Sequence, residues 1–204
     1  MNDKNAQKMF KAALIYCKKN YPDELKMIMS ISPDTLNNMT VKDFLEEYCW
    51  VVYARGFKES ILKSLFPRLK KAFRNFDLTA LKQMRSPTEV LVVFKHKVKA
   101  NCFLKGSKAI ATEGFITFKR RLKEKGICVL EELPGIGPIT KSHLARNIGL
   151  ADVPKRDRWL VRAAKACNTN VDEFVVFLSK QNKLKRGVID AVIWRYGADK
   201  KLGL

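Results

Sequence analysis

A short string rich in proline and glycine, Leu133-Pro-Gly-Ile-Gly-Pro138, limits the architecture of this chain more than any other segment. It lies between two apolar patterns of helical spacing, and Gly135 and Gly137 permit backbone conformations and close contacts that other residues resist. Pro138 suits the first position of a helix, where its missing N–H removes no hydrogen bond. The string therefore predicts two helices joined by a tight turn, here called the 133–138 hairpin.

The helix after this hairpin begins with N–H groups that have no acceptor within the helix, and such groups are natural donors to a phosphate oxygen. We expect Gly135, Ile136 and Gly137 to contact phosphate. Lys141, in the first turn of that helix, is expected to bind the same phosphate through its positive charge. The alternative is a tight helix–helix turn without a ligand. The basic chain around the hairpin favours phosphate binding.

The chain carries 40 Lys and Arg residues against 20 Asp and Glu residues, a formal net charge of +20. Such an excess favours a polyanionic partner, with nucleic acid as the first candidate. Charge alone does not exclude an acidic membrane surface or the ribosome as the binding partner. A hydrophobic fraction of 47% over 204 residues is enough to bury a core, so we expect one folded unit or one core with two lobes.

Apolar residues recur three and four positions apart along most of the chain, which predicts a nearly all-helical protein. Thr40 and Asp43 have the spacing of a capping box, and the helix after them, roughly 41–54, is expected to be the central buried one. The polar stretch 30–39 carries turn signals, and residues 89–94 leave a strand open. The other expected helices span about 6–19, 61–73, 78–84, 88–95, 97–111, 114–125, 127–132, 138 onward, 157 onward, 170–180 and 184–197.

Neither a metal site nor a membrane segment is indicated by the sequence. The five cysteines are scattered without metal-ligand spacing, and the four closely spaced cysteines of an iron–sulfur cluster are missing. No apolar run has the length of a membrane span, and the N-terminus lacks a signal-peptide pattern. We expect a cytoplasmic protein, nucleoid-associated if prokaryotic, with no cofactor; a monovalent cation at the hairpin stays open.

The hairpin, a Gly149–Pro154 stretch and Asp157 follow one another in an order that resembles the helix–hairpin–helix DNA glycosylase superfamily typified by endonuclease III. The resemblance covers roughly residues 41–165. It implies an all-α fold of two helical lobes with a cleft between them, within a single glycosylase unit over 1–204. One lobe would comprise 41–152 with the hairpin, and the other 1–40 plus 153–204.

The resemblance also implies a catalytic role for Asp157. Breaking a base–sugar bond builds positive charge on the deoxyribose, and a fixed carboxylate stabilises that charge and orients a water. The alternative is that Asp157 only caps the next helix, and the two roles are compatible. Asp152 is a weaker candidate. Lys155, Arg156 and Arg158 surround Asp157 and are expected to draw the DNA backbone towards it.

One position departs from the superfamily pattern. Members that also nick the strand carry a lysine two residues after the second hairpin glycine, where this chain has Ile139. An isoleucine forms no Schiff base with the sugar, and Lys141 is two residues further along the helix, so that it points away. We therefore expect a monofunctional glycosylase that uses water. A lysine from elsewhere in the chain leaves a bifunctional glycosylase and lyase as an alternative.

A flipped base leaves a gap in the duplex that the protein must fill. The Val51–Phe57 segment resembles the segment that supplies the superfamily's wedge, a side chain inserted into the duplex, with Arg55 at the wedge position and Phe57 beside it. His96 falls in the loop that faces the lesion in the superfamily. A solvated basic loop is an equal alternative for His96. Tyr53 and Trp50 are expected in the core. Three lysines near His96 are expected to contact phosphate or nothing: Lys95, Lys97 and Lys99.

The sequence thus predicts an enzyme that acts on double-stranded DNA containing an altered base, as a monomer without an obligate protein partner or membrane. A non-catalytic helix–hairpin–helix DNA-binding protein remains the alternative from another class. An oxidised purine, an alkylated base, a mismatched pyrimidine and a modified base of phage DNA all stay open as substrates.

Overall fold

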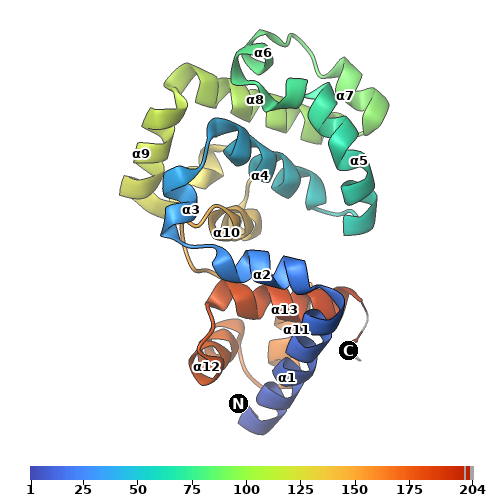
Figure 1. Cartoon of the computed structure of the whole chain (residues 1–204), viewed down its shortest axis with the longest axis vertical. Coiled ribbons are helices and arrows are strands. Elements are labelled where there is room, and N and C mark those ends of the chain that lie inside the picture. The colour runs from blue at the N-terminus through green and yellow to red at the C-terminus, as the bar shows by residue number, and fades with distance from the viewer. Residues whose placement is uncertain (200, 203–204) are drawn as a thin grey trace. The chain divides into compact units, whose positions relative to one another are not determined.

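The computed structural model describes residues 1–199 and 201–202, and its secondary structure in these residues is entirely helical (Figure 1). The expected all-α class is confirmed. The chain divides into two compact units: residues 1–32 with 151–204, here called the terminal unit, and residues 33–150, here called the central unit. None of the helices in the described residues is both long and apolar enough to cross a membrane.

The terminal unit is built around α13, which is buried along most of its length. Its helices are α1 (Asp3–Asn20), α2 (Pro22–Ser30), α11 (Arg158–Ala166), α12 (Val171–Asn182) and α13 (Arg186–Ala198). α1, α2, α11 and α12 all contact α13. Because the termini of the chain supply both α1 and α13, this unit needs both ends of the sequence to complete its core.

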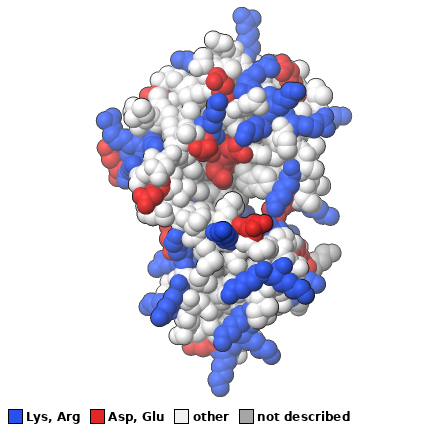
Figure 2. All heavy atoms as spheres, in the orientation of Figure 1, with Lys and Arg blue, Asp and Glu red and all other residues white. Residues whose placement is uncertain are grey.

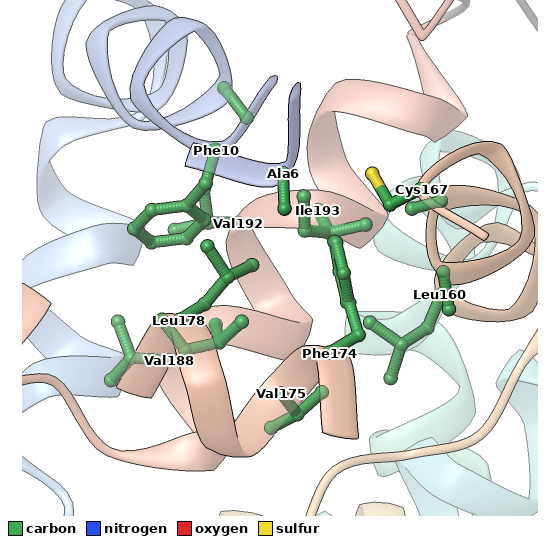
Figure 3. Close-up of a cluster of buried hydrophobic side chains, with 14 of the residues drawn as sticks. Ala6, Phe10, Leu160, Cys167, Phe174, Val175, Leu178, Val188, Val192 and Ile193 are labelled. Atoms are coloured by element: carbon green, nitrogen blue, oxygen red, sulfur yellow. The ribbon is translucent and has the colours of Figure 1, made fainter. Parts of the chain in front are cut away.

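The spacing of buried residues on α1 explains how that helix packs. Ala6, Phe10, Ala13 and Cys17 lie four, three and four positions apart, so they share one face, and all are buried. Figure 3 shows Ala6 and Phe10 meeting side chains from α11, α12 and α13. Burying a large apolar side chain such as that of Phe10 stabilises a fold by about 1.5–3 kcal/mol.

One ion pair holds α2 to α13. Both carboxylate oxygens of Glu24 accept hydrogen bonds from Nη2 of Arg195 at 2.6 Å. The guanidinium lies 4.3 Å from the ring centre of Tyr21 and 4.6 Å from that of Trp194. Only 7% of the Arg195 side chain is exposed, so this charge depends on its partners for solvation.

The central unit is arranged around α4, whose contacts include α5, α8 and α10 (Figure 1). The sequence folds this way because α4 begins at the capping box of Thr40 and Asp43 and is apolar on most sides. Seven of its residues are buried, Tyr48 and Tyr53 among them. The helices of this unit are α3 (Pro33–Asn38), α4 (Val41–Ala54), α5 (Glu59–Ala72), η1 (Arg74–Phe76), α6 (Leu78–Gln83), α7 (Thr88–Val93), α8 (Lys97–Glu113), α9 (Phe115–Lys125), η2 (Gly126–Glu132) and α10 (Pro138–Asn147).

The structure differs from the sequence-based expectations in two segments. Residues 22–30 form a helix that was not expected, and the stretch 30–39, expected as a turn, contains α3. The helix expected at 88–95 is present as α7, in place of the strand left open at 89–94, and the helical segment expected at 127–132 is present as the 3₁₀ helix η2. The expected lobe 1–40 also differs from the terminal unit, because α3 belongs to the central unit.

We expect Arg195→Met to lower the free energy of unfolding by about 3 kcal/mol, because it leaves the Glu24 carboxylate without its bidentate partner. Arg156→Met is the matched control: it removes the same charge from an ion pair with Asp172 whose side chains are more than half exposed, and should change stability by less than about 1 kcal/mol. Thermal and urea unfolding measure both. Equal losses in the two variants would contradict the role given to Arg195.

Candidate functional site

The 133–138 hairpin is shaped by one glycine and one hydrogen bond across its turn. Gly135 has a φ of +88°, a conformation that residues with a Cβ rarely adopt. A Cβ at this position would lie 3.2 Å from Cβ of Cys102 and 3.3 Å from Cγ2 of Val52. The N–H of Ile136 donates to the carbonyl of Leu133 at 3.0 Å, which closes the turn. The hairpin is therefore packed closely against α4 and α8.

A buried tyrosine on α4 fixes the hairpin from its inner side. The hydroxyl of Tyr48 donates to the carbonyl of Pro134 at 2.6 Å and is 3.1 Å from that of Cys102. The side chain of Ile136 is also buried. Tyr48 was not singled out from the sequence, where it is one aromatic residue among several on an apolar helix. Its role depends on a contact between positions 86 residues apart.

The start of α10 presents backbone donors. The N–H of Gly137 donates to Oγ1 of Thr140 at 2.7 Å, and the N–H of Lys141 donates to the carbonyl of Gly137 at 2.8 Å. The N–H groups of Ile139 and Thr140 have no acceptor among the residues that the structure describes. Pro138 contributes no donor. Two N–H groups at a helix N-terminus, where the helix dipole is positive, form an arrangement that suits an oxygen of an anion.

Two side chains near these donors have defined surroundings. Nζ of Lys141 lies 2.7 Å from Oε2 of Glu131, which raises the pKa of the lysine. Lys141 thus has an acidic partner, Glu131, within the central unit. To bind a phosphate, Lys141 would have to leave this ion pair. Ile139 is half exposed and supplies no amine.

In the terminal unit, Asp157 is the N-cap of α11. Its Oδ1 accepts from the N–H of Trp159 at 2.9 Å and from that of Leu160 at 3.2 Å. Its Oδ2 faces Nζ of Lys155 at 3.7 Å. The side chain is 14% exposed, so the carboxylate has a fixed orientation and retains access to solvent. A carboxylate held in this way stabilises positive charge without having to reorganise.

Two further aspartates fix the loop that leads to Asp157. Asp152 accepts from the N–H groups of Arg186 and Gly187 at 3.0 and 2.9 Å, so it caps α13. Asp190, buried on α13, accepts from the N–H of Lys155 at 2.8 Å. The weaker catalytic candidate Asp152 therefore has both carboxylate oxygens engaged with the backbone. Asp190 gave no signal in the sequence, because its contact is made between segments distant along the chain.

The cations next to Asp157 already have partners within the terminal unit. Arg156 forms an exposed ion pair with Asp172 at 2.6 Å, and Arg158 lies over the ring of Trp159 at 4.8 Å. Exposed ion pairs of this kind contribute at most about 1 kcal/mol, so a phosphate competes for Arg156 at little cost. Figure 2 shows Lys and Arg side chains spread widely over the visible face, with acidic side chains in smaller groups.

The expected wedge lies where α4 ends in the central unit. Arg55 is the C-cap of α4 and is exposed, and the ring of Phe57 is 39% exposed. His96 is the N-cap of α8, and its Nδ1 accepts from the N–H of Lys99 at 3.3 Å. The ring centres of Phe57 and His96 are 5.9 Å apart. The structure thus brings all three expected residues of this region close to one another.

The expectation that Lys99 contacts phosphate or nothing is wrong. Its side chain is buried, and Nζ donates to the carbonyls of Val52 at 2.5 Å and Arg55 at 2.8 Å, with that of Tyr53 at 3.4 Å. These carbonyls belong to the last turn of α4, which lacks intrahelical donors. Burial, together with the nearby charge of Arg55, lowers the pKa of Lys99 to about 8.

Tyr53 and Trp50 pack within the central unit. Tyr53 is fully buried, with its ring centre 5.1 Å from that of Phe94, and its hydroxyl has no hydrogen-bond partner in the described part of the chain. Burial raises the pKa of this hydroxyl. Trp50 lies edge-on to Phe66 at 5.2 Å. Neither ring is arranged as an exposed stacking surface.

Within residues 1–199 and 201–202, no group of three or more His, Cys, Asp and Glu side chains is arranged to hold a metal ion. Comparisons with protein-family models, curated proteins and solved structures find no match for this chain.

We expect Gly135→Ala to lower the free energy of unfolding by about 1–2 kcal/mol from the positive φ alone, with a further loss from the contact with Cys102. Gly137→Ala is the control, because its φ of −131° suits any residue and a Cβ there meets nothing within 4 Å. It should lower stability by no more than about 1 kcal/mol, because alanine is a poorer N-cap of α10 than glycine, with no added strain or contact. Urea denaturation distinguishes the two, and an unaffected Gly135→Ala variant would contradict the packing described for the hairpin.

The lowered pKa of Lys99 predicts a pH-dependent difference in stability. The folded protein releases this proton near pH 8, whereas the unfolded chain releases it near pH 10.4, so the folded state binds fewer protons between these values. The free energy of unfolding of the wild type, relative to Lys99→Met, should therefore be constant below about pH 8 and rise from there to about pH 10.4. Denaturation curves measured from pH 7 to 10.5 test this, and a constant difference would refute it.

Proposed function

We propose that this chain is a DNA glycosylase of the helix–hairpin–helix type, which hydrolyses the N-glycosidic bond of a damaged or modified base in duplex DNA. The observation that carries the proposal is the pair of backbone N–H groups of Ile139 and Thr140 at the start of α10, which lack an acceptor in the described chain. They follow a turn that Gly135 and Tyr48 hold against the central unit. Donors fixed in this way suit a DNA phosphate.

The chemical step is assigned to Asp157. With Oδ1 engaged by two backbone N–H groups, Oδ2 is the oxygen that would face the developing positive charge on the sugar or orient the attacking water. Lys155, Arg156 and Arg158 would hold the phosphates on either side, and Arg156 would give up only an exposed ion pair to do so. In the central unit, the 55–57 segment at the end of α4 would fill the gap in the duplex as the base leaves it.

The attacking group is proposed to be water, because Ile139 occupies the position at which lyases of this type carry their amine. One observation favours a second candidate function. Nζ of Lys155 lies 3.7 Å from Asp157, which provides an amine next to the proposed catalytic carboxylate. An amine there would attack the sugar C1′, displace the base and form a Schiff base that leads to strand cleavage.

The test is a cleavage assay on duplex oligonucleotides that carry a panel of altered bases, with half of each sample heated in alkali. The wild type should cut one or more duplexes only after alkali. Asp157→Asn should reduce the rate by about 100-fold or more, since asparagine keeps the helix cap but loses the charge. Asp77→Asn, the same change at the N-cap of α6, should leave the rate unchanged.

The other outcomes separate the alternatives. Cutting without alkali, with a borohydride-trapped adduct that disappears in Lys155→Met, would establish the lyase. Tight duplex binding with no cutting of any member of the panel, and no effect of Asp157→Asn, would favour a non-catalytic DNA-binding protein.

A further inference from the structure

The end of α4 presents an aromatic ring on a fixed base. Gly56, with a φ of +81°, turns the chain after Arg55, and Phe57 follows in the 55–57 turn. The ring of Phe57 stands edge-on to Phe94, with 4.8 Å between ring centres, and retains 39% of its exposure. Phe94 is itself buried against Tyr53. The ring of Phe57 thus packs on the core on one side, and the rest of its surface is exposed to solvent.

The buried ammonium of Lys99 ties this turn to α8. Its Nζ donates to the carbonyls of Val52 and Arg55, at the start and the end of the last turn of α4. The same Nζ lies 5.4 Å from the centre of the Phe57 ring. Charged donors form stronger hydrogen bonds than neutral ones. An α4 end without this donor would have to turn its carbonyls towards water. The position of the 55–57 turn therefore depends on a residue more than 40 positions away.

The charges around the ring favour a nucleic acid as its partner. Arg55, Lys58, Lys95 and Lys97 are exposed. Glu59, the acidic residue nearest to them in sequence, forms an ion pair with Lys63 at 2.9 Å. An aromatic surface with cations around it is the combination that binds an unstacked base together with its phosphates.

We propose that Lys99 is a positioning residue, which locks the 55–57 turn so that the exposed ring of Phe57 stacks on a base left unpaired in an opened duplex. This inference rests on the proposed function, and it assigns the stacking contact to Phe57 and not to the neighbouring Arg55. The guanidinium of Arg55 is then available for the adjacent phosphates.

The experiment measures binding, so it does not depend on knowing the excised base. Fluorescence anisotropy compares a duplex that contains a tetrahydrofuran abasic-site analogue opposite a normal base with the same duplex fully paired. The wild type should prefer the abasic duplex. Phe57→Ala should lose about tenfold of that preference, and Phe57→Tyr should retain it. Lys97→Met, which removes an exposed charge next to Lys99 in the sequence, should weaken both complexes equally.

A double-mutant cycle distinguishes positioning from a general loss of structure. If Lys99 acts through Phe57, Lys99→Met should lower the preference as Phe57→Ala does, and the double variant should lose no more than Phe57→Ala alone. Losses that multiply in the double variant would overturn the positioning role. A preference that survives both single substitutions would overturn the inference while leaving the proposed function intact, whereas a wild type that binds neither duplex would overturn both.

Discussion

Close packing against helix α4 determines the geometry of the central unit. The 133–138 hairpin reaches α4 through the hydroxyl of Tyr48 and through Gly135, whose missing side chain leaves room for Val52. The carbonyls at the other end of the same helix are held by Lys99. One buried helix therefore fixes both the backbone donors of the hairpin and the turn that carries Phe57, although these segments are distant in sequence.

In the terminal unit, hydrogen bonds from backbone N–H groups to three aspartates fix the candidate residue Asp157 and its loop. Asp152 caps α13, Asp190 holds the backbone of Lys155, and Asp157 caps α11. Three carboxylates thus organise one short loop in a chain with a net charge of +20. Because capping uses only Oδ1 of Asp157, the structural role of this residue and the proposed catalytic role do not compete for the same atom.

Sequence patterns predicted the features that depend on neighbouring residues. The capping box of Thr40 and Asp43 and the helix that begins at Pro138 are both present, since they are encoded within a few positions. Turn signals were misleading at 33–38, because prolines and asparagines that mark turns also begin and end short helices. The hairpin and Asp157 could also be recognised from the sequence, because each is encoded by a few neighbouring residues.

Residues whose role depends on tertiary contacts could not be identified from the sequence. Lys95, Lys97 and Lys99 look alike in a basic stretch, yet Lys99 is buried and the other two are exposed. Likewise, the contacts of Tyr48 with Pro134 and of Asp190 with Lys155 join segments that no local pattern connects. These residues support the candidate site, so its framework was less predictable than the residues proposed to carry the chemistry.

Release of a free base tests the central claim most directly. Duplex DNA bearing oxidised, alkylated and enzymatically modified bases would be incubated with the protein, and the small molecules released would be identified by mass spectrometry. A glycosylase should release at least one intact altered base, and Asp157→Asn should release at least 100-fold less. Release of nucleotides in place of free bases, or equal release by the variant, would contradict the assignment of N-glycosidic bond cleavage to Asp157.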